Sequence, residues 1–551
     1  MVKLNSISAP RPRAGRTPRE LRAARLDERL VRLARGRGAV DVAIGYVLLA
    51  LMAGDRLIRL GFSSMVDYAR ERLGLPARTA WFLTRLAREL MTRPLLRLAV
   101  IAGAVSPRKA MVVMRAAVGA DEPAYVFAAM TLRLADLEAL VREEGSEGIE
   151  EFDVEKIALR MTPEQQDRLD AALEVGRELE GYDKARHILL EIIAAEWLSS
   201  HAEYGEDSGE DQGECGPTDA VSDAYPENGI AEWQIPAADL QRQLDRIAEA
   251  HDLLDAGELP ADLDPAELDA RARRLMEARL GFDEPLGRLL RQFFDERGWK
   301  VLGYASQEEY CRERLGLAAR TVRQRIWLER KMDALPALRH ALAAGVITYT
   351  KALLVAKDAT PEDVRERIEE VGSTTWQQAE QESTEEEDRQ NRARGVRCIW
   401  GPRDILDLLL QAIGCAQAYY SSLGESISAG EALARMADHF VATWTEYLKQ
   451  RKTSSKRREV LMRTGGLCAM PGCSRAAVHD HHIDFRSHGG SDELSNRVGL
   501  CQVCHLRGVH KGYLEVVGRA GELLRFRVRG PLREILGDWW IGPDWKPRRS
   551  P

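Results

Sequence analysis

The sequence lacks an apolar run long enough to cross a membrane. Its most apolar stretch extends from Ala39 to Ala53 and contains Asp41, so it predicts a buried helix instead of a membrane span. No apolar segment follows the N-terminal charges at the distance typical of a secretory signal. Insertion into a membrane and export are therefore not expected, and a cytoplasmic location is the default.

Cysteine and histidine are scarce, with 8 and 11 residues among 551. Half of the cysteines and six of the histidines nevertheless fall within about 45 residues near the C-terminus. The four thiols form two short knuckles, Cys468-x4-Cys473 and Cys501-x2-Cys504. Four thiolates make a closed tetrahedral site, so the spacing predicts a structural zinc ion, with free buried thiols as the alternative. Disulfides are disfavoured because nothing marks the chain for export.

The clustered histidines indicate a second, catalytic metal site beside the thiols. His481 and His482 are adjacent, so in an extended strand their side chains point to opposite faces. One imidazole can then bind a metal while the other faces a substrate. His505 and His510 are five residues apart, slightly wider than the spacing that stacks two ligands on a helix, and Gly508 permits a turn between them.

In order and spacing, this region resembles the zinc-ribbon-containing branch of the HNH endonuclease family. The resemblance covers about residues 455–530, under a fifth of the chain. It is carried by Arg463-Thr-Gly-Gly-Leu-Cys468, Pro471-Gly-Cys473, Asp480-His-His-Ile483, Gly489-Gly-Ser-Asp-Glu-Leu-Ser-Asn496, Leu500-Cys-Gln-Val-Cys-His505 and His510. The fold that it implies is a ββα-metal finger, in which two strands, a loop and a helix grip one divalent ion. The resemblance also implies a bacterial protein.

The resemblance implies a role for each polar residue of the motif. His482 resembles the general base that takes a proton from the attacking water, and imidazole titrates near neutral pH. His481 and His505 resemble ligands of one divalent ion (Mg, Mn, Ni or Zn), and His510 is a third candidate ligand. Asn496 resembles the central asparagine, which braces the loop of the base in some members and touches the metal in others. His482, Asn496 and His505 are thus the expected catalytic residues, and DNA phosphodiester hydrolysis is the expected reaction.

Charged residues inside the motif suggest supporting roles. Arg486 and Arg497 are candidates to clamp a phosphate, although ordinary solvated surface charges would look the same. Asp480 and Asp484 are candidates to orient metal ligands. For the whole cluster, a zinc-binding module without catalysis is the alternative.

The charge is distributed unevenly along the chain. A net charge of −7 argues by itself against nucleic acid as a partner. Residues 451–551 nevertheless carry a net charge of +9, and residues 1–450 carry −16. The nuclease-like end is therefore the basic end, as phosphate binding requires. A second basic stretch at the N-terminus predicts either a disordered arm over residues 1–19 that contacts phosphate or a solvated helix start.

The N-terminal four fifths of the chain contain an internal repeat. The segment from Gly61 to Thr79 returns as Gly303 to Thr321, and the offset of 242 residues holds without gaps to Lys109 and Lys351. We infer two copies of one module, over residues 20–200 and 237–450, joined by an acidic flexible linker over residues 201–236. Leu, Ala, Arg and Glu dominate both copies, with apolar residues at steps of three and four, which predicts helices.

Each copy contains a possible helix-turn-helix. Arg-Leu-Gly-Leu, with Gly74 or Gly316 at the turn, precedes an Ala-Arg-Thr sequence that can cap the next helix. Candidate base-contacting residues are Arg78, Thr79 and Arg85 in the first copy and Arg320, Arg323 and Arg325 in the second. An αα-hairpin that packs only within its own module is the favoured alternative. Two copies can also form a pseudo-twofold body that straddles DNA or pairs with another chain as a homodimer.

Strand signals are concentrated at the C-terminus. Residues 513–517 and 523–529 predict a hairpin around Gly518–Gly521 within a nuclease domain over residues 451–530. A tail over residues 531–551 holds Trp539, Trp540 and Trp545, which either seal the small core or stack bases.

The expected fold is thus mainly α, with a duplicated helical module followed by a small zinc-containing ββα-metal domain and a short hairpin. The expected function is a metal-dependent endonuclease acting on DNA. A non-catalytic zinc-dependent nucleic-acid-binding protein and a helical assembly scaffold are the alternatives.

Overall fold

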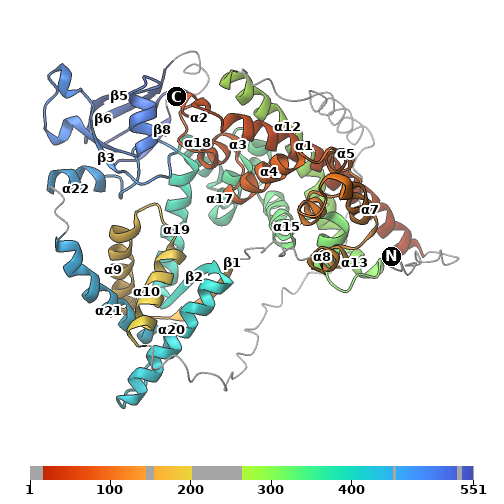
Figure 1. The fold of residues 1–551 in the computed structure, drawn as a ribbon, viewed down its shortest axis with the longest axis horizontal. Helices are drawn as coiled ribbons and strands as arrows, with labels where there is room; N and C mark the ends of the chain where they lie inside the picture. Colours follow the sequence, from red (N-terminus) through yellow and green to blue (C-terminus); the bar gives the residue numbers. More distant parts are fainter. Residues whose placement is uncertain (1–16, 144–153, 202–263, 451–454, 530–536, 550–551) are drawn as a thin grey trace. The chain divides into compact units, whose positions relative to one another are not determined.

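The computed structural model describes residues 17–143, 154–201, 264–450, 455–529 and 537–549. Most of the predicted N-terminal arm and nearly all of the predicted linker lie outside these residues. The chain forms two compact units, each assembled from distant parts of the sequence (Figure 1). The helical unit comprises Met1–Gly54, Leu73–Ile149 and Ile235–Ile368, and the C-terminal unit comprises Asp55–Arg72, Glu150–Gln234 and Glu369–Pro551. Each unit therefore takes segments from both predicted modules. None of the described helices is long and apolar enough to span a membrane.

Helices make up the described part of the helical unit. They are α1 (Pro18–Leu51), α4 (Ala77–Leu90), α5 (Pro94–Ile101), α6 (Pro107–Val113), η1 (Gly119–Asp121), α7 (Glu122–Thr131), α8 (Leu134–Glu143), α12 (Pro265–Asp295), α13 (Gly298–Val301), α14 (Gln307–Glu309), the π-helix η3 (Tyr310–Leu315), α15 (Ala319–Ala334), α16 (Pro336–Ala343) and α17 (Tyr349–Asp358). The long helix α1 begins with a capping box, in which the Thr17 hydroxyl accepts from the Glu20 amide and the Glu20 carboxylate accepts from the Thr17 amide.

Contacts between α1 and α12 repeat with the same interval as the sequence. Arg37 Nε lies 3.2 Å from Asp283 Oδ1, and Arg279 Nε lies 2.7 Å from Asp41 Oδ1. Adding 242 to Arg37 and Asp41 gives Arg279 and Asp283, so the two ion pairs occupy equivalent places. All four side chains are buried. The helices therefore cross in antiparallel fashion about a local twofold axis between equivalent residues.

A second reciprocal contact lies at the turns before α4 and α15. Gly74 and Gly316 both have a φ of 66°, which favours glycine. A Cβ atom at Gly74 would lie 2.4 Å from Thr348 Cβ, and one at Gly316 would lie 2.6 Å from Ser106 Cβ. Thr348 and Ser106, also 242 residues apart, are the N-caps of α17 and α6. Each turn of one copy thus packs against a helix N-terminus of the other.

The C-terminal unit contains helices and all the described strands. Its elements are α2 (Arg56–Arg59), α3 (Met65–Leu73, whose last residue belongs to the helical unit), β1 (Val154–Arg160), α9 (Pro163–Glu180), α10 (Arg186–Ser200), α18 (Val364–Ser373, shared with the helical unit), α19 (Trp376–Ala393), β2 (Val396–Pro402), α20 (Arg403–Ser422), α21 (Ala429–Gln450), α22 (Ser455–Met462), β3 (His479–His482), η4 (Arg486–His488), η5 (Leu494–Asn496), β4 (Arg497–Leu500), the π-helix η6 (Val503–Val509), β5 (Leu514–Arg519), β6 (Leu523–Val528), β7 (Trp539–Ile541) and β8 (Pro547–Arg549).

A helical layer of this unit is organised around β1 and β2. These strands pair antiparallel with Ile157 opposite Ile399, and the two residues are 242 apart. Helices α9, α10, α20 and α21 lie together (Figure 1). They enclose one apolar core in which Trp197 and Phe440 are buried. Equivalent strands of the two copies therefore pair with each other.

The remainder of this unit is a small domain that contains the thiols and histidines. β3 and β4 form an antiparallel pair, and η6 follows directly. β5 and β6 confirm the predicted hairpin, but the sheet continues through β7 and β8 in the order β5-β6-β7-β8. Trp539 and Trp540 lie in β7, where Arg525 stacks over the Trp540 ring. The predicted fold class, mainly helical with a small C-terminal metal-binding domain, is confirmed.

Two details of the helix-turn-helix prediction are wrong. Arg325 does not reach solvent, because its side chain is 4% exposed and pairs with Asp283 at 2.9 Å. The Ala-Arg-Thr sequences do not cap α4 and α15, since the N-cap positions are Pro76 and Ala318 and neither provides a side-chain hydrogen bond. Thr79 instead lies within the first turn of α4.

Candidate active site and zinc site

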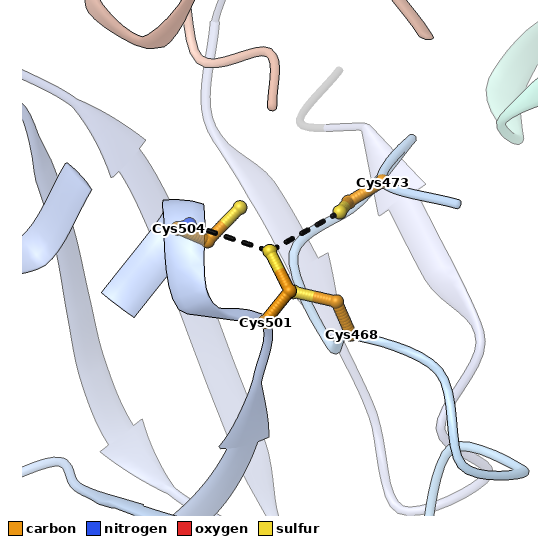
Figure 2. Close-up of side chains that lie close together, drawn as sticks. All are labelled: Cys468, Cys473, Cys501 and Cys504. Atoms are coloured by element: carbon orange, nitrogen blue, oxygen red, sulfur yellow. Dashed lines mark hydrogen bonds between the residues drawn. The ribbon is translucent and has the colours of Figure 1, made fainter. Parts of the chain in front are cut away.

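The four predicted cysteine ligands converge at one point (Figure 2). All four are buried, and their sulfur atoms lie within 4.8 Å of one another. The sulfurs of Cys473 and Cys501 are 3.8 Å apart, and the amide of Cys504 donates to Cys501 Sγ at 3.3 Å. Zn–S bonds of about 2.3 Å in a tetrahedron require sulfurs about 3.8 Å apart, so this group fits a zinc ion. Hydrogen bonds within the group lower the pKa of Cys501 and raise the pKa values of Cys473 and Cys504, so they favour a thiolate at Cys501.

Local backbone contacts build the first knuckle. Cys468 N donates to Arg475 O at 2.8 Å, and Cys473 N donates to Met470 O at 3.0 Å. Gly472 completes the turn with a φ of 75°, as its place in Pro471-Gly472 suggests. The knuckle therefore turns the two thiols of Cys468 and Cys473 toward the second pair.

A segment from the N-terminal part of the chain supports this knuckle from outside. Ser63 Oγ lies 3.1 Å from Cys473 Sγ and 2.9 Å from Asp67 Oδ2. Ser474 Oγ donates to Asp67 Oδ1 at 2.6 Å, and Arg70 pairs with the same carboxylate at 3.0 Å. Asp67 is fully buried, so this network fixes the knuckle in a water-excluded place. Sequence reasoning missed it, because more than 400 residues separate Ser63 from Cys473.

Strand β3 divides its side chains between two faces, as an extended strand must. His479 and His481 both approach His505. Their ring centroids lie 4.8 Å and 5.0 Å, respectively, from the ring centroid of His505. His482 points away from them toward Asp492. One nitrogen each of His481, His505 and His510 lies within 4.8 Å of the others. The structure thus brings together the three predicted histidine ligands and separates them from the predicted base.

The five-residue spacing of His505 and His510 is accommodated by a π-turn. His510 N donates to His505 O at 3.0 Å, which is the i to i+5 bond of a π-helix. The two Nε2 atoms are consequently 3.1 Å apart. Gly508 is buried within this turn, where a Cβ atom would lie 2.6 Å from Leu514 Cδ1.

The histidine group is electrostatically suited to a cation. Burial, followed by the charges of the neighbouring imidazoles, lowers the pKa of His481 to about 3. Burial, followed by the charges of His510 and His479, lowers the pKa of His505 to about 4. Both rings are therefore neutral near pH 7, the form in which imidazole binds metal. His505 Nδ1 is buried with no hydrogen-bond partner, and three nitrogen donors face one point, so the residues present fit a divalent ion.

Asp492 holds the candidate base, His482. The His482 Nε2 atom lies 2.8 Å from Asp492 Oδ1, and Arg486 pairs with the other oxygen of Asp492 at 2.5 Å. Hydrogen bonds from His482 and Arg486 lower the pKa of Asp492, so it remains a carboxylate that accepts the Nε2 proton.

Asn496 closes the loop between β3 and β4. Its Oδ1 accepts from the Asp484 amide at 2.8 Å, while its Nδ2 donates to Asp484 O at 3.1 Å and to Ser491 O at 2.8 Å. Gly490 lies against this loop, and a Cβ atom there would lie 1.8 Å from Asp484 O. Of the two roles considered for Asn496, this geometry matches the brace.

The other predicted charges occupy different surroundings. Arg497 donates through Nε to Asp480 Oδ1 at 3.0 Å across the β3–β4 pair. The candidate phosphate clamp and the candidate orienting carboxylate therefore pair with each other. Arg486 is exposed beside Asp492, and Asp484 is exposed and takes part in the Asn496 brace through its backbone. Asp55, which the sequence did not single out, pairs at 2.5 Å with Arg507 and at 2.8 Å with Lys511 beside the histidine ligands.

Comparison with known proteins identifies this domain. Residues 466–510 match the HNH endonuclease family model, so the C-terminal domain is an HNH domain. The match includes both cysteine pairs and the three converging histidines. The chain has no significant match among curated proteins or among solved structures.

Proposed function

We propose that the chain is a metal-dependent endonuclease that hydrolyses DNA phosphodiester bonds. The observation that carries the proposal is the convergence of His481, His505 and His510 within 4.8 Å, next to the His482–Asp492 pair, in a domain that matches the HNH endonucleases.

The residues of the site divide the work between them. His481, His505 and His510 hold the divalent ion, and the four cysteines hold a structural zinc ion that fixes the start of η6. When bound, the divalent ion supplies positive charge that stabilises the phosphoryl oxygens and the departing oxygen of the scissile bond.

His482 acts as the general base in this proposal. Asp492 accepts its Nε2 proton and thereby leaves Nδ1 unprotonated, ready to take a proton from water. Asn496 holds the loop from Asp484 to Ser491 through its hydrogen bonds. The loop in turn keeps Asp492 within hydrogen-bond distance of His482. Arg486 is the exposed candidate for a phosphate contact.

The described residues contain one such histidine site, although the helical body is duplicated. One site cuts one strand, so a single chain would produce nicks. Double-strand breaks would require two chains, as a homodimer or as successive events.

A plasmid-nicking assay tests the proposal. Purified protein is incubated with supercoiled DNA and Mg²⁺, Mn²⁺ or Ni²⁺, and the His482→Ala variant is compared with His488→Ala. His488 is an exposed histidine of the same loop and is not placed in the site, which makes it a matched control.

We expect His482→Ala to abolish nicking while the zinc content, measured by mass spectrometry, stays at that of the unchanged protein. His488→Ala should nick normally. Cutting by His482→Ala at the unchanged rate would exclude this residue as the base. No cutting by the unchanged protein with any of these ions, combined with retained DNA binding, would favour a non-catalytic zinc-dependent binding protein instead.

A further inference from the structure

Helices α4 and α15 each expose a stripe of arginine and tryptophan. On α4 the exposed residues at successive turns are Arg78, Trp81, Arg85 and Arg88, and Trp81 is 52% exposed. Residues three or four apart share a helix face, so these four form one stripe. Adding 242 gives Arg320, Arg323, Trp327 and Arg330 on α15, where the arginines are exposed and the tryptophan is half-buried. Each stripe thus contains three arginines and one tryptophan, with arginine and tryptophan exchanged at the two middle positions.

Most of this charge is not used within the protein. Among the described residues, Arg78, Arg85, Arg88 and Arg320 have no ion pair or hydrogen bond from their guanidinium groups. Arg323 and Arg330 form exposed pairs with Glu308 at 3.2 Å and Asp295 at 2.9 Å. Exposed pairs of this kind are worth at most about 1 kcal/mol, so a phosphate can replace the carboxylates.

The arginines and tryptophans of the stripes are not needed to pack the two helices, because other residues of each helix serve that purpose. On α4 the opposite face buries Leu83, Leu86 and Leu90, which already supply the packing. At α15 the buried Arg325 is the arginine that serves the fold, through Asp283. Arg78, Arg85, Arg88 and Arg320 are therefore available to a partner outside the chain.

The symmetry of the helical unit favours a double helix as that partner. The paired contacts of Arg37 with Asp283 and of Arg279 with Asp41 place equivalent residues of the two copies about a local twofold axis. The stripes lie on helices related by that axis. Duplex DNA also has local twofold symmetry, and proteins with two related elements commonly use both on one duplex. Arginine is well matched to phosphate, and tryptophan beside it can cover a sugar.

We propose that the two stripes bind the phosphates of double-stranded DNA without selecting a sequence. This inference deepens the proposed function, since it assigns the helical body to holding the duplex substrate. Binding is independent of cutting, so it is tested in the full-length His482→Ala protein, which separates failure of this inference from failure of the nuclease proposal.

The experiment measures binding to a fluorescent duplex of about 30 base pairs by anisotropy at several salt concentrations. One variant carries Arg78→Ala, Arg85→Ala and Arg88→Ala, and a second carries Arg320→Ala, Arg323→Ala and Arg330→Ala. The matched control removes three exposed arginines elsewhere, namely Arg133→Ala, Arg389→Ala and Arg403→Ala, whose side chains are 69%, 73% and 74% exposed. All three variants have the same net charge.

We expect each stripe variant to bind the duplex at least about tenfold more weakly than the control. The salt slope should fall by roughly 2 to 3, since each phosphate contact contributes about 0.9. Circular dichroism and the melting temperature should be unchanged, because the residues are exposed. Equal affinities of the stripe variants and the control would overturn the proposal. A loss of affinity for single-stranded DNA alone, with duplex binding intact, would also overturn it.

Discussion

His505 and His510 face each other across a π-turn, with their Nε2 atoms 3.1 Å apart. In a regular α-helix, residues five apart point about 140° away from each other. The bond from His510 N to His505 O removes this divergence and makes His510 a partner of His505 and His481. Single π-turns inside helices are frequent at functional sites.

His510→Ala should therefore weaken binding of the catalytic ion. Loss of an outer partner of a metal ligand typically costs 10- to 100-fold in metal affinity, so loss of a ligand should cost at least about 100-fold. The measurement is calorimetric titration of Ni²⁺ into protein already loaded with structural zinc. His488→Ala serves as the control, and an unchanged affinity in His510→Ala would remove His510 from the ligand set.

Asp492→Asn should slow nicking while DNA affinity remains unchanged. The amide can still contact His482, but it can either accept a hydrogen bond from Nε2 or donate one to it. The tautomer of His482 is therefore no longer fixed. We expect a loss of about 10- to 100-fold in the nicking rate, the size found for partners that orient functional histidines. Glu493→Gln, the neighbouring exposed carboxylate, should nick at the normal rate. A full rate in Asp492→Asn would show that His482 needs no such partner.

Cys504→Ala should unfold the small C-terminal domain. Binding of a structural zinc ion contributes on the order of 10 kcal/mol to folding, and Cys504 is a buried member of the sulfur group. The zinc content should fall to near zero, and limited proteolysis should cut the domain rapidly. Cys398→Ala, a buried thiol in β2 away from this group, is the matched control and should retain zinc. Retention of zinc by Cys504→Ala would contradict the four-thiolate site.

The sequence revealed the ligand types of both sites because sulfur and imidazole are rare and their spacing is local. It did not reveal Asp492 as the partner of His482, since an exposed aspartate in a loop carries no distinguishing pattern. The network of Ser63 and Asp67 beside Cys473 was equally hidden, because it depends on the tertiary fold.

In the helical body, too, local features could be predicted from the sequence, whereas tertiary contacts could not. Periodicity predicted helices, and the repeat of 242 residues was visible from Gly61 onward. A repeat does not say whether its copies pack within themselves or across each other, since both arrangements bury the same apolar faces. The reciprocal contacts of Gly74 with Thr348 and of Gly316 with Ser106 belong to the second arrangement. Burial of Arg325 was missed because arginine is rarely buried without a charged partner, and only tertiary contacts reveal that partner, Asp283. Its counterpart in the first copy, the buried Leu83, was the signal that could have indicated it.

The buried ion pairs between α1 and α12 should make the stability of the helical unit sensitive to Asp283. Burial alone would raise the pKa of this carboxyl, but the charges of Arg325, Arg37 and Arg279 outweigh burial and hold the pKa well below its usual value. Asp283→Asn removes the carboxylate partner of Arg325 and leaves Arg37 and Arg279 to share the single carboxylate of Asp41. Breaking a buried pair in this way typically costs about 3–5 kcal/mol.

The pH dependence of that cost follows from the sign of the shift. A carboxyl whose pKa is lowered on folding contributes stability above its unfolded pKa of about 3.9 and loses this contribution as the pH falls toward the folded value. The difference in unfolding free energy between the unchanged protein and Asp283→Asn should therefore be largest near pH 7 and smaller near pH 3. Urea unfolding followed by circular dichroism at both pH values measures it. Asp333→Asn, whose side chain is 46% exposed and pairs with Arg339 at 3.0 Å, should cost less than about 1 kcal/mol at either pH. A difference for Asp283→Asn that is small at pH 7, or that grows as the pH is lowered, would mean that the arginines do not depend on this carboxylate.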